Sequence, residues 1–311
     1  MPPPSSTESA DDLRPAPSPS TWFSALLLAV VVLAWGLNWT VTKILVASIP
    51  PLWTIALRNA VASIVLLVLL NATRQFVVPN RGDLPVVLVV AMLHMVGFST
   101  LVAAGLTVAP VGRSIVLGYT TPIWVVPAAY LFLGEAVTLR KIAGVVLGLV
   151  GLGIIFSPYD LDWSDRPLLI GHMLILAAAL CWAVSIVYVR HHRWRSTPFQ
   201  LVFWQALLAT AVLSVVAMIA EGIPAIQWNT SLVLGLAYAG IIGSALAYWA
   251  MVVVNKTLPA ISTSLGVLAT PVVGIGSAAF FLNESISLGV LIAGALILIG
   301  VVLGTLDASR N

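Results

Sequence analysis

The sequence predicts an all-α membrane protein with ten transmembrane helices, arranged as two five-helix repeats of inverted topology. Three observations predict this fold class: the composition, the spacing of the charged residues, and an internal repeat. Hydrophobic residues make up 60% of the 311 residues and charged residues only 8%, whereas soluble domains carry roughly 25% charged residues. So few charges could not cover a water-facing surface, which excludes a soluble enzyme or a nucleic-acid-binding protein.

The charged residues divide the chain into apolar segments that are long enough to cross a bilayer. A helix needs about 20 apolar residues to span a hydrocarbon core of about 30 Å. Runs of this length exclude barrel strands, and backbone groups in lipid must then bond within helices. A count of nine or eleven spans stays open mainly at 222–255, where a second short segment could lie. The ten expected spans are approximately residues 22–46, 52–72, 84–106, 112–133, 138–156, 168–190, 198–220, 230–252, 259–282 and 286–306.

Residues 1–21 have a different composition from the rest of the chain. They are rich in Pro, Ser and acidic residues, with Arg14 as their one cation, which predicts a disordered cytoplasmic arm. A secretory signal peptide would place positive charge next to the first apolar segment. This arm has no positive charge next to the first apolar segment, so we expect the first helix to stay in the protein rather than to be cleaved.

The distribution of Lys and Arg predicts the orientation in the membrane. With the N-terminus inside, ten of the 14 cations fall on inner loops and tails, and Lys43, Arg113 and Arg166 fall outside. The remaining one, Arg58, lies within the second span. Cytoplasmic loops carry the excess of Lys and Arg in membrane proteins, so both termini are expected in the cytoplasm.

The first half of the chain recurs in the second half at a nearly constant displacement of 147 to 149 residues. The matching pairs are Trp35/Trp182, Pro51/Pro198, Pro110/Pro259, Pro122/Pro271, Glu135/Glu284, Leu139/Leu288 and Gly151/Gly300. We therefore expect two domains, 22–157 and 168–306. Because each repeat has five helices, an odd number, the second repeat crosses the membrane in the opposite orientation to the first. Inverted repeats of this kind are typical of secondary transporters, which bind substrate near the bilayer midplane.

Aromatic and weakly polar side chains recur near the middle of the expected spans, where anchoring at the membrane interface does not explain them. A tryptophan at this depth offers an N–H donor and a ring face to a ligand. Such residues suit a zwitterion or an amphipathic amine, although packing explains each one alone as readily. The expected substrate-binding residues are Trp35, Asn38, His94, Phe98, Ser99, Tyr119, Thr121, Trp124, Trp182, Ser185, Tyr248 and Thr270.

Two further sets of residues are expected to serve transport. Lys43, Arg58 and Arg113 lie toward the outer side, where they could attract an anion at a gate or extend to the interface. Three prolines remove backbone donors within the fourth and ninth spans and are expected to kink them: Pro122, Pro127 and Pro271.

Small residues predict how the two repeats meet. Gly144 with Gly148 and Gly300 with Gly304 form GxxxG pairs on the fifth and tenth spans, and such pairs allow close backbone approach. We expect these two helices to pack together, with a homodimer seam as the competing use. A monomer and a homodimer are both compatible with the sequence.

Motifs for catalysis, ATP hydrolysis and metal binding do not occur. There is no HExxH and no Walker A loop, so no catalytic residue, metal or cofactor is expected. Transport would then be facilitated or driven by a gradient. Because every Asp and Glu falls in a tail, in a loop or near a helix end, His94 is the remaining titratable group at depth.

Residues 35–58, WGLNWTVTKILVASIPPLWTIALR, resemble the opening of the EamA repeat of the drug/metabolite transporter superfamily. The shared features are a Trp-Gly in the first helix, a Lys near its end, a Pro, and an Arg early in the second helix. The second hallmark is a Pro-rich helix followed by a Gly-Glu or similar pair, here Pro122 before 134–135 and Pro271 before 283–284. The second repeat departs from the first with Gln205 in place of Arg58 and Asn283 in place of Gly134.

The resemblance covers about residues 22–306 and is strongest to the YddG-type amino-acid exporters. It implies a multi-pass carrier of the bacterial inner membrane that moves small metabolites by alternating access, above all amino acids, aromatic ones and related amphipathic amines included. The alternatives are a sugar-phosphate or nucleotide-sugar carrier, which would want paired midplane cations, and a polytopic membrane protein that does not transport. The expected partners are a small-molecule substrate and the lipid bilayer, with no nucleic acid.

Overall fold

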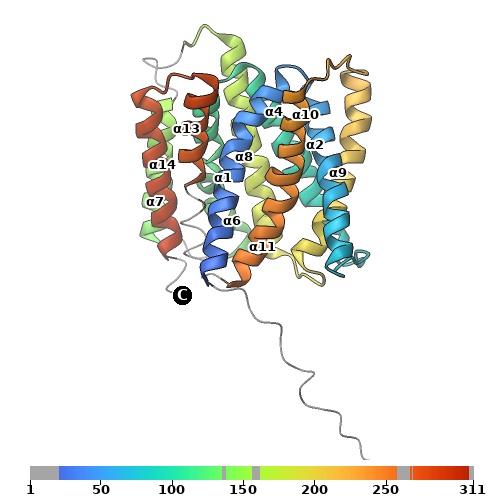
Figure 1. Cartoon of the computed structure of the whole chain (residues 1–311). Coiled ribbons are helices and arrows are strands. Elements are labelled where there is room, and N and C mark those ends of the chain that lie inside the picture. Colours follow the sequence, from blue (N-terminus) through green and yellow to red (C-terminus); the bar gives the residue numbers. More distant parts are fainter. Residues whose placement is uncertain (1–20, 135–137, 156–161, 258–266, 268, 308–311) are drawn as a thin grey trace, which may run out of the picture.

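The protein is a bundle of helices (Figure 1), seen in a computed structural model that describes residues 21–134, 138–155, 162–257, 267 and 269–307. Within these residues, all regular secondary structure is helical. In the first half the helices are α1 (Thr21–Val46), α2 (Pro51–Ala72), α3 (Leu84–Val89), η1 (Val90–Phe98), α4 (Ser99–Val108), α5 (Val111–Gly118), α6 (Thr121–Leu133) and α7 (Leu139–Ile155). In the second half they are α8 (Arg166–His191), α9 (Pro198–Ala220), α10 (Thr230–Ala237), η2 (Tyr238–Leu246), α11 (Ala247–Thr257), α13 (Thr270–Leu282) and α14 (Leu288–Asp307).

Several of these elements join into longer helices. The elements α3, η1 and α4 form one apolar helix, Leu84–Val108, and α5 with α6 forms another, Val111–Leu133. The second is interrupted at residues 119–120, directly before Pro122 in the first turn of α6. Pro127 lies inside α6, and Pro271 lies in the first turn of α13.

Seven helices in the described part of the chain are long and apolar enough to cross a membrane. They agree closely with the predicted spans 22–46 to 112–133 and 168–190 to 230–252. Helix α7 has 17 residues, while Thr270–Leu282 and Leu288–Gly300 are shorter apolar helices. The predicted ninth span begins at 259, outside the described residues, so the count of ten stays a prediction.

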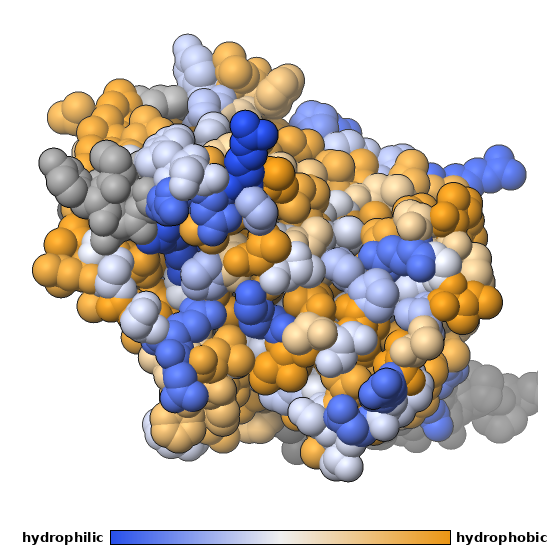
Figure 2. Space-filling model, turned by 90° about the horizontal axis from the view of Figure 1, so that it is seen from above, coloured by the Kyte–Doolittle hydropathy of each residue, from blue (hydrophilic) through white to orange (hydrophobic). Residues whose placement is uncertain are grey.

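The sides of the bundle expose large apolar side chains. Ile64 is 66% exposed, Ile219 81% and Phe280 78%, which a water-soluble protein would bury. The end that lies at the top of Figure 1 mixes hydrophilic and hydrophobic side chains (Figure 2). Apolar flanks on an all-helical bundle are the surface that a lipid bilayer requires. The chain is therefore an all-α, multi-pass membrane protein.

The helix ends follow ordinary capping rules. Proline occupies the first turn of α2, α8 and α9, and Thr197 with Gln200 forms a capping box at the start of α9. Helix α6 ends at Gly134 with φ 66°, and α13 ends at Asn283 with φ 53°. Glycine and asparagine are the two residues that best tolerate this left-handed conformation. The difference between Gly134 and Asn283 in the two halves therefore preserves the same helix cap.

Two π-helical segments occupy matching positions in the two halves. Val90 and Tyr238, which begin η1 and η2, are 148 residues apart, as are Phe98 and Leu246, which end them. π-Helices are rare and often mark functional sites. Their recurrence at one displacement extends the internal repeat from single residues to backbone geometry.

Helices α7 and α14 form the most extensive helix pair and lie together at one side of the bundle (Figure 1). A Cβ at Gly151 would lie 2.9 Å from the carbonyl oxygen of Ala293, and one at Gly300 would lie 2.5 Å from that of Gly144. The prediction that the fifth and tenth spans pack together is confirmed, with Gly144 and Gly300 in close approach, whereas Gly148 faces Ile123 of α6 instead. Helices α2 and α9, the second helices of the two repeats, also pack against each other.

Candidate functional site

His94, on the π-helical segment η1, lies among aromatic side chains from both halves of the chain. Its ring stacks on Phe98 with centroids 5.4 Å apart. The Trp182 ring on α8 lies 5.7 Å from His94 and 5.2 Å from Phe98. Tyr119, at the break between α5 and α6, meets Trp182 edge-on at 6.4 Å.

Tyr248 on α11 connects this group to α1. Its hydroxyl lies 3.2 Å from Nε2 of His94, and its ring meets Trp35 edge-on at 6.4 Å. The resulting aromatic cluster consists of Trp35, His94, Phe98, Tyr119, Trp182 and Tyr248. All six side chains are half-buried, so they are not sealed within the core and keep surface that a ligand could contact.

Arg58 on α2 lies beside the aromatic cluster. Its guanidinium donates a hydrogen bond of 2.8 Å to Oγ of Ser99, which in turn donates one of 3.3 Å to the carbonyl oxygen of His94. Arg58 is also within electrostatic reach of His94 and Tyr248. Seven residues that the sequence predicted for substrate binding thus lie together: the six residues of the aromatic cluster and Ser99. Arg58, which the sequence had suggested for an outer gate, lies with them.

Apart from Thr270, whose side chain lies within hydrogen-bonding reach of the Tyr119 hydroxyl, the other predicted binding residues lie outside these contacts. Thr121 donates to Gly118 O, and the indole of Trp124 donates to Oγ1 of Thr120 within its own helix. Asn38 faces Gly243 of η2. Ser185 and Thr270 are buried on α8 and α13.

Lys43 lies at the end of α1, away from the aromatic cluster and close to Glu284. Its Nζ donates to Ala109 O at 3.0 Å, and the Glu284 carboxylate exerts a Coulombic attraction on it. That carboxylate accepts the backbone N–H groups of Val111 and Gly112, at 2.8 and 3.0 Å. Arg113 follows directly on α5. Two of the three predicted gate cations therefore lie where an acid of the second half caps a helix of the first.

Glu221 performs the same task for α2. Its two carboxylate oxygens accept the backbone N–H groups of Leu52 and Trp53, at 3.1 and 3.2 Å. The Trp53 indole then donates to Gly222 O at 2.7 Å. Carboxylates are stabilised at helix N-termini because the backbone donors there have no partner within the helix.

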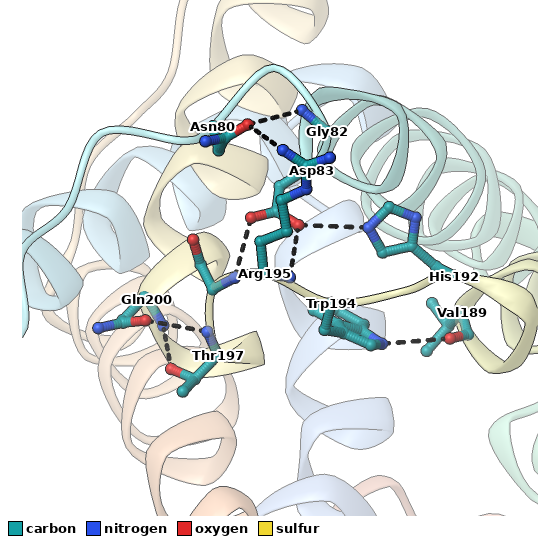
Figure 3. A network of polar contacts seen from close by, with 10 residues as sticks. Asn80, Gly82, Asp83, Val189, His192, Trp194, Arg195, Thr197 and Gln200 are labelled. Atoms are coloured by element: carbon teal, nitrogen blue, oxygen red, sulfur yellow. Dashed lines mark hydrogen bonds and ion pairs between the residues drawn. The ribbon is translucent and has the colours of Figure 1, made fainter.

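Asp83 caps the opposite end of the bundle, where the loop before α3 meets the loop between α8 and α9 (Figure 3). Its buried carboxylate accepts the backbone N–H groups of Arg195 and Ser196 at 3.1 and 2.9 Å, and lies 3.3 Å from Nε2 of His192. Burial alone would raise the pKa of Asp83. The hydrogen bonds from Arg195, Ser196 and His192 outweigh burial and hold this pKa below its ordinary value.

Sequence reasoning missed the roles of Asp83, Glu221 and Glu284. Each acid sits at a helix end, which is where the sequence placed it, but its partner is a backbone N–H more than 100 residues away. Backbone donors carry no sequence signal, so only the fold reveals these contacts. In the described part of the chain, no group of three or more His, Cys, Asp or Glu could hold a metal ion.

Comparison with known proteins places these features in a family. The EamA-like transporter family matches residues 22–157 and again 169–306. A crystal structure with 20% identity superposes with a TM-score of 0.67, covering 94% of this chain and 100% of the other, which shows the shared fold.

Individual relatives match over nearly their whole length. An uncharacterized transporter, YoaV of Bacillus subtilis (strain 168), is 26% identical over 90% of this chain and 96% of its own. A probable amino-acid metabolite efflux pump of Escherichia coli (strain K12) is 26% identical over 88% and 91%. An uncharacterized inner membrane transporter, YedA of the same strain, is 29% identical over 87% and 88%.

Proposed function

Because this chain belongs to the EamA-like transporter family, we propose that it is a secondary transporter for amino acids, aromatic ones included. The aromatic cluster is the observation that carries this proposal. Ring faces from both halves surround His94, with one cation beside them. Aromatic side chains bind apolar and aromatic groups through their faces and edges. A relative named as a probable amino-acid metabolite efflux pump supports the same substrate class.

The proposed architecture is a ten-helix bundle of two inverted repeats that works by alternating access. The recurrence of η1 as η2 and the pairing of α7 with α14 support it. The cluster draws on helices of both halves, so a movement of one half against the other would alter access to it. The proposed orientation has both termini in the cytoplasm, in a bacterial inner membrane, with export as the physiological direction.

A carrier for sugar phosphates or nucleotide sugars is less well supported. A doubly charged anion would want at least two cations at the site. Arg58 donates to Ser99 beside the aromatic cluster, whereas Lys43 donates to Ala109 at the end of α4. The single guanidinium of Arg58 suits the single carboxylate of an amino acid.

Transport into liposomes tests the proposed function directly. Purified protein is reconstituted, loaded with unlabelled L-phenylalanine, and assayed for uptake of labelled L-phenylalanine without an imposed ion gradient. We expect saturable uptake that other neutral amino acids compete for, above the level in protein-free liposomes. Trp228→Ala serves as a matched control, because Trp228 is 55% exposed, lies in the loop before α10 and takes no part in the ring contacts of the cluster. Absence of uptake for a full panel of amino acids would refute the proposal.

A further inference from the structure

Arg58 is a charged group without an acidic partner in the part of the chain that the structure describes. Arginine stays protonated in proteins, and an ionised group inside a membrane protein is normally paired or functional. Here the guanidinium makes one hydrogen bond, to the neutral hydroxyl of Ser99. The acids Asp83, Glu221 and Glu284 bind backbone groups at helix ends instead. The charge of Arg58 is therefore left for another group to balance.

Two buried polar atoms beside this charge also lack a hydrogen-bond partner. They are Nε of Arg58 and Nδ1 of His94. The two residues are linked through Ser99, which bonds to the Arg58 guanidinium and to the backbone carbonyl of His94, and the Arg58 charge is within electrostatic reach of the His94 ring. Leaving a buried polar atom unpaired costs its full desolvation penalty. Unpaired buried groups beside an unbalanced charge are typical of a binding site whose ligand supplies the missing contacts.

The chemistry of these groups selects a carboxylate. A guanidinium presents its donors as a planar fork that matches the two oxygens of a carboxylate. His94 adds a ring nitrogen, and the rings of Phe98 and Trp182 lie next to it. We propose that Arg58 is the carboxylate-binding residue of the transport site, with the apolar group of the same substrate against the aromatic cluster. This inference rests on the proposed function.

The same geometry says what the site does not require. The ammonium group of an amino-acid substrate binds best to a carboxylate. Among the described residues, no Asp or Glu contacts the aromatic cluster. Ring faces and the unpaired Oδ1 of Asn38 are the weaker alternatives open to it. The substrate class is thus a monocarboxylate that bears an aromatic or apolar group, and its amino group is dispensable.

Three probes that differ by one group each test this inference. L-Phenylalanine carries a carboxylate and an ammonium, 3-phenylpropanoate keeps only the carboxylate, and phenethylamine keeps only the ammonium. In competition with labelled L-phenylalanine uptake, we expect 3-phenylpropanoate to compete within a few-fold of phenylalanine. Phenethylamine should compete at least about tenfold more weakly, because it forgoes the charged hydrogen bonds to Arg58.

Substitution of Arg58 is the second test of this inference. We expect Arg58→Gln to raise the KM for L-phenylalanine by about 10- to 100-fold and to abolish the preference for 3-phenylpropanoate over phenethylamine. Arg58→Lys, which keeps the charge but not the fork, should fall between. Arg74→Gln is the matched control, since Arg74 is an exposed arginine just beyond the end of α2. An unchanged KM in a folded Arg58→Gln protein would overturn the inference.

Ligand-induced thermal stabilisation in detergent separates this inference from the proposed function. Stabilisation by 3-phenylpropanoate but not by phenethylamine, in a protein that fails to transport, would leave the carboxylate site standing and remove the proposed function. If phenylalanine is taken up but both probes compete equally, the proposed function stands and the carboxylate site at Arg58 is refuted. If Arg58→Gln does not fold, the comparison of the two probes on the unsubstituted protein still tests whether the site recognises the carboxylate.

Discussion

Trp182 contacts three other members of the aromatic cluster through its ring. Its ring meets His94, Phe98 and Tyr119. Aromatic pairs of this kind contribute about 0.5–1.5 kcal/mol each beyond area burial. We therefore expect Trp182→Ala to raise the KM for L-phenylalanine roughly tenfold. The measurement is initial uptake rate in liposomes at matched protein incorporation.

A ring-preserving substitution distinguishes binding from packing at this position. Removing a large buried ring can destabilise a protein by about 3–5 kcal/mol, so Trp182→Ala could act through the fold. Trp182→Phe keeps an aromatic face and should retain most of the activity and the melting temperature. Wild-type kinetics in both variants, and in His94→Ala and Trp35→Ala, would show that these side chains only pack.

At the scale of single residues, the sequence indicated which residues to consider but not which of them contact one another. Trp35 and Trp182 stood out because interfacial anchoring cannot explain a tryptophan in mid-span. Trp124 satisfied the same criterion, yet its indole bonds within its own helix. For Arg58, position along the second span suggested an outer gate or extension to the interface. Its bond to Ser99 depends on how α2 packs against the helix of η1 and α4, which spacing along the chain does not encode.

The contacts of Asp83 with the loop before α9 carry a testable pH dependence. The pKa of Asp83 is held below its ordinary value of 3.8 by its hydrogen-bond donors. A group with a lowered folded-state pKa contributes stability that is present above the ordinary pKa and is lost as pH falls through the lowered one. We expect Asp83→Asn to lose about 1.5–3 kcal/mol at pH 7. The difference from the wild type should shrink below about pH 4.

Thermal unfolding in detergent between pH 7 and pH 3 measures this effect. Asp162→Asn is a suitable control, because Asp162 lies exposed in the loop before α8 and bonds only to nearby residues. Its melting temperature should follow that of the wild type at pH 7. A constant difference between wild type and Asp83→Asn across the whole pH range would contradict the assigned role of the carboxylate.

Two glycines on α7 offer a matched test of helix pairing. A Cβ at Gly151 would lie 2.9 Å from Ala293 O on α14, whereas one at Gly153 would meet nothing within 4 Å. We expect Gly151→Ala to destabilise the protein by about 1–3 kcal/mol through overpacking. Gly153→Ala should be neutral or stabilise by up to about 1 kcal/mol through helix propensity. Equal melting temperatures for the two variants would mean that α7 and α14 do not pack in this way.

At the scale of elements, the apolar runs and the charges between them predicted helix existence and boundaries closely. The agreement is physical, because a membrane helix must be continuous, apolar and about as long as the bilayer is thick. The π-helical segments η1 and η2 were not predicted. Apolar residues satisfy α- and π-helical turns equally, so nothing in the types of residues 90–98 or 238–246 favours one over the other.

At the scale of the whole molecule, orientation in the membrane is a separate prediction from the fold. The ten-to-three distribution of Lys and Arg predicts that both termini face the cytoplasm. A reporter fused after Arg310 should be active if it requires the cytoplasm and inactive if it requires export. The same reporter inserted in the loop before α8, at Asp162, should give the opposite result. Activity of an exported reporter at the C-terminus would reverse the orientation.

The placement of the acids also predicts how transport is driven. A proton-coupled carrier must bind and release a proton in step with its substrate, normally on a carboxylate or histidine at depth. Asp83, Glu221 and Glu284 each accept two backbone N–H groups at a helix end, which holds them in structural roles. In the described part of the spans, His94 is the histidine within electrostatic reach of the cation that we assign to the substrate.

We therefore predict facilitated and electroneutral movement of a net-neutral amino acid down its own gradient, reversible in direction. In liposomes, the net flux of L-phenylalanine should follow the substrate gradient alone and should not respond to an imposed pH step or membrane potential. The cluster needs only modest affinity, because a substrate held too tightly would not leave. Accumulation above the outside concentration, driven by a pH step and abolished by an uncoupler, would contradict this and would identify His94 as the coupling group. His94→Gln would then lose accumulation while retaining exchange.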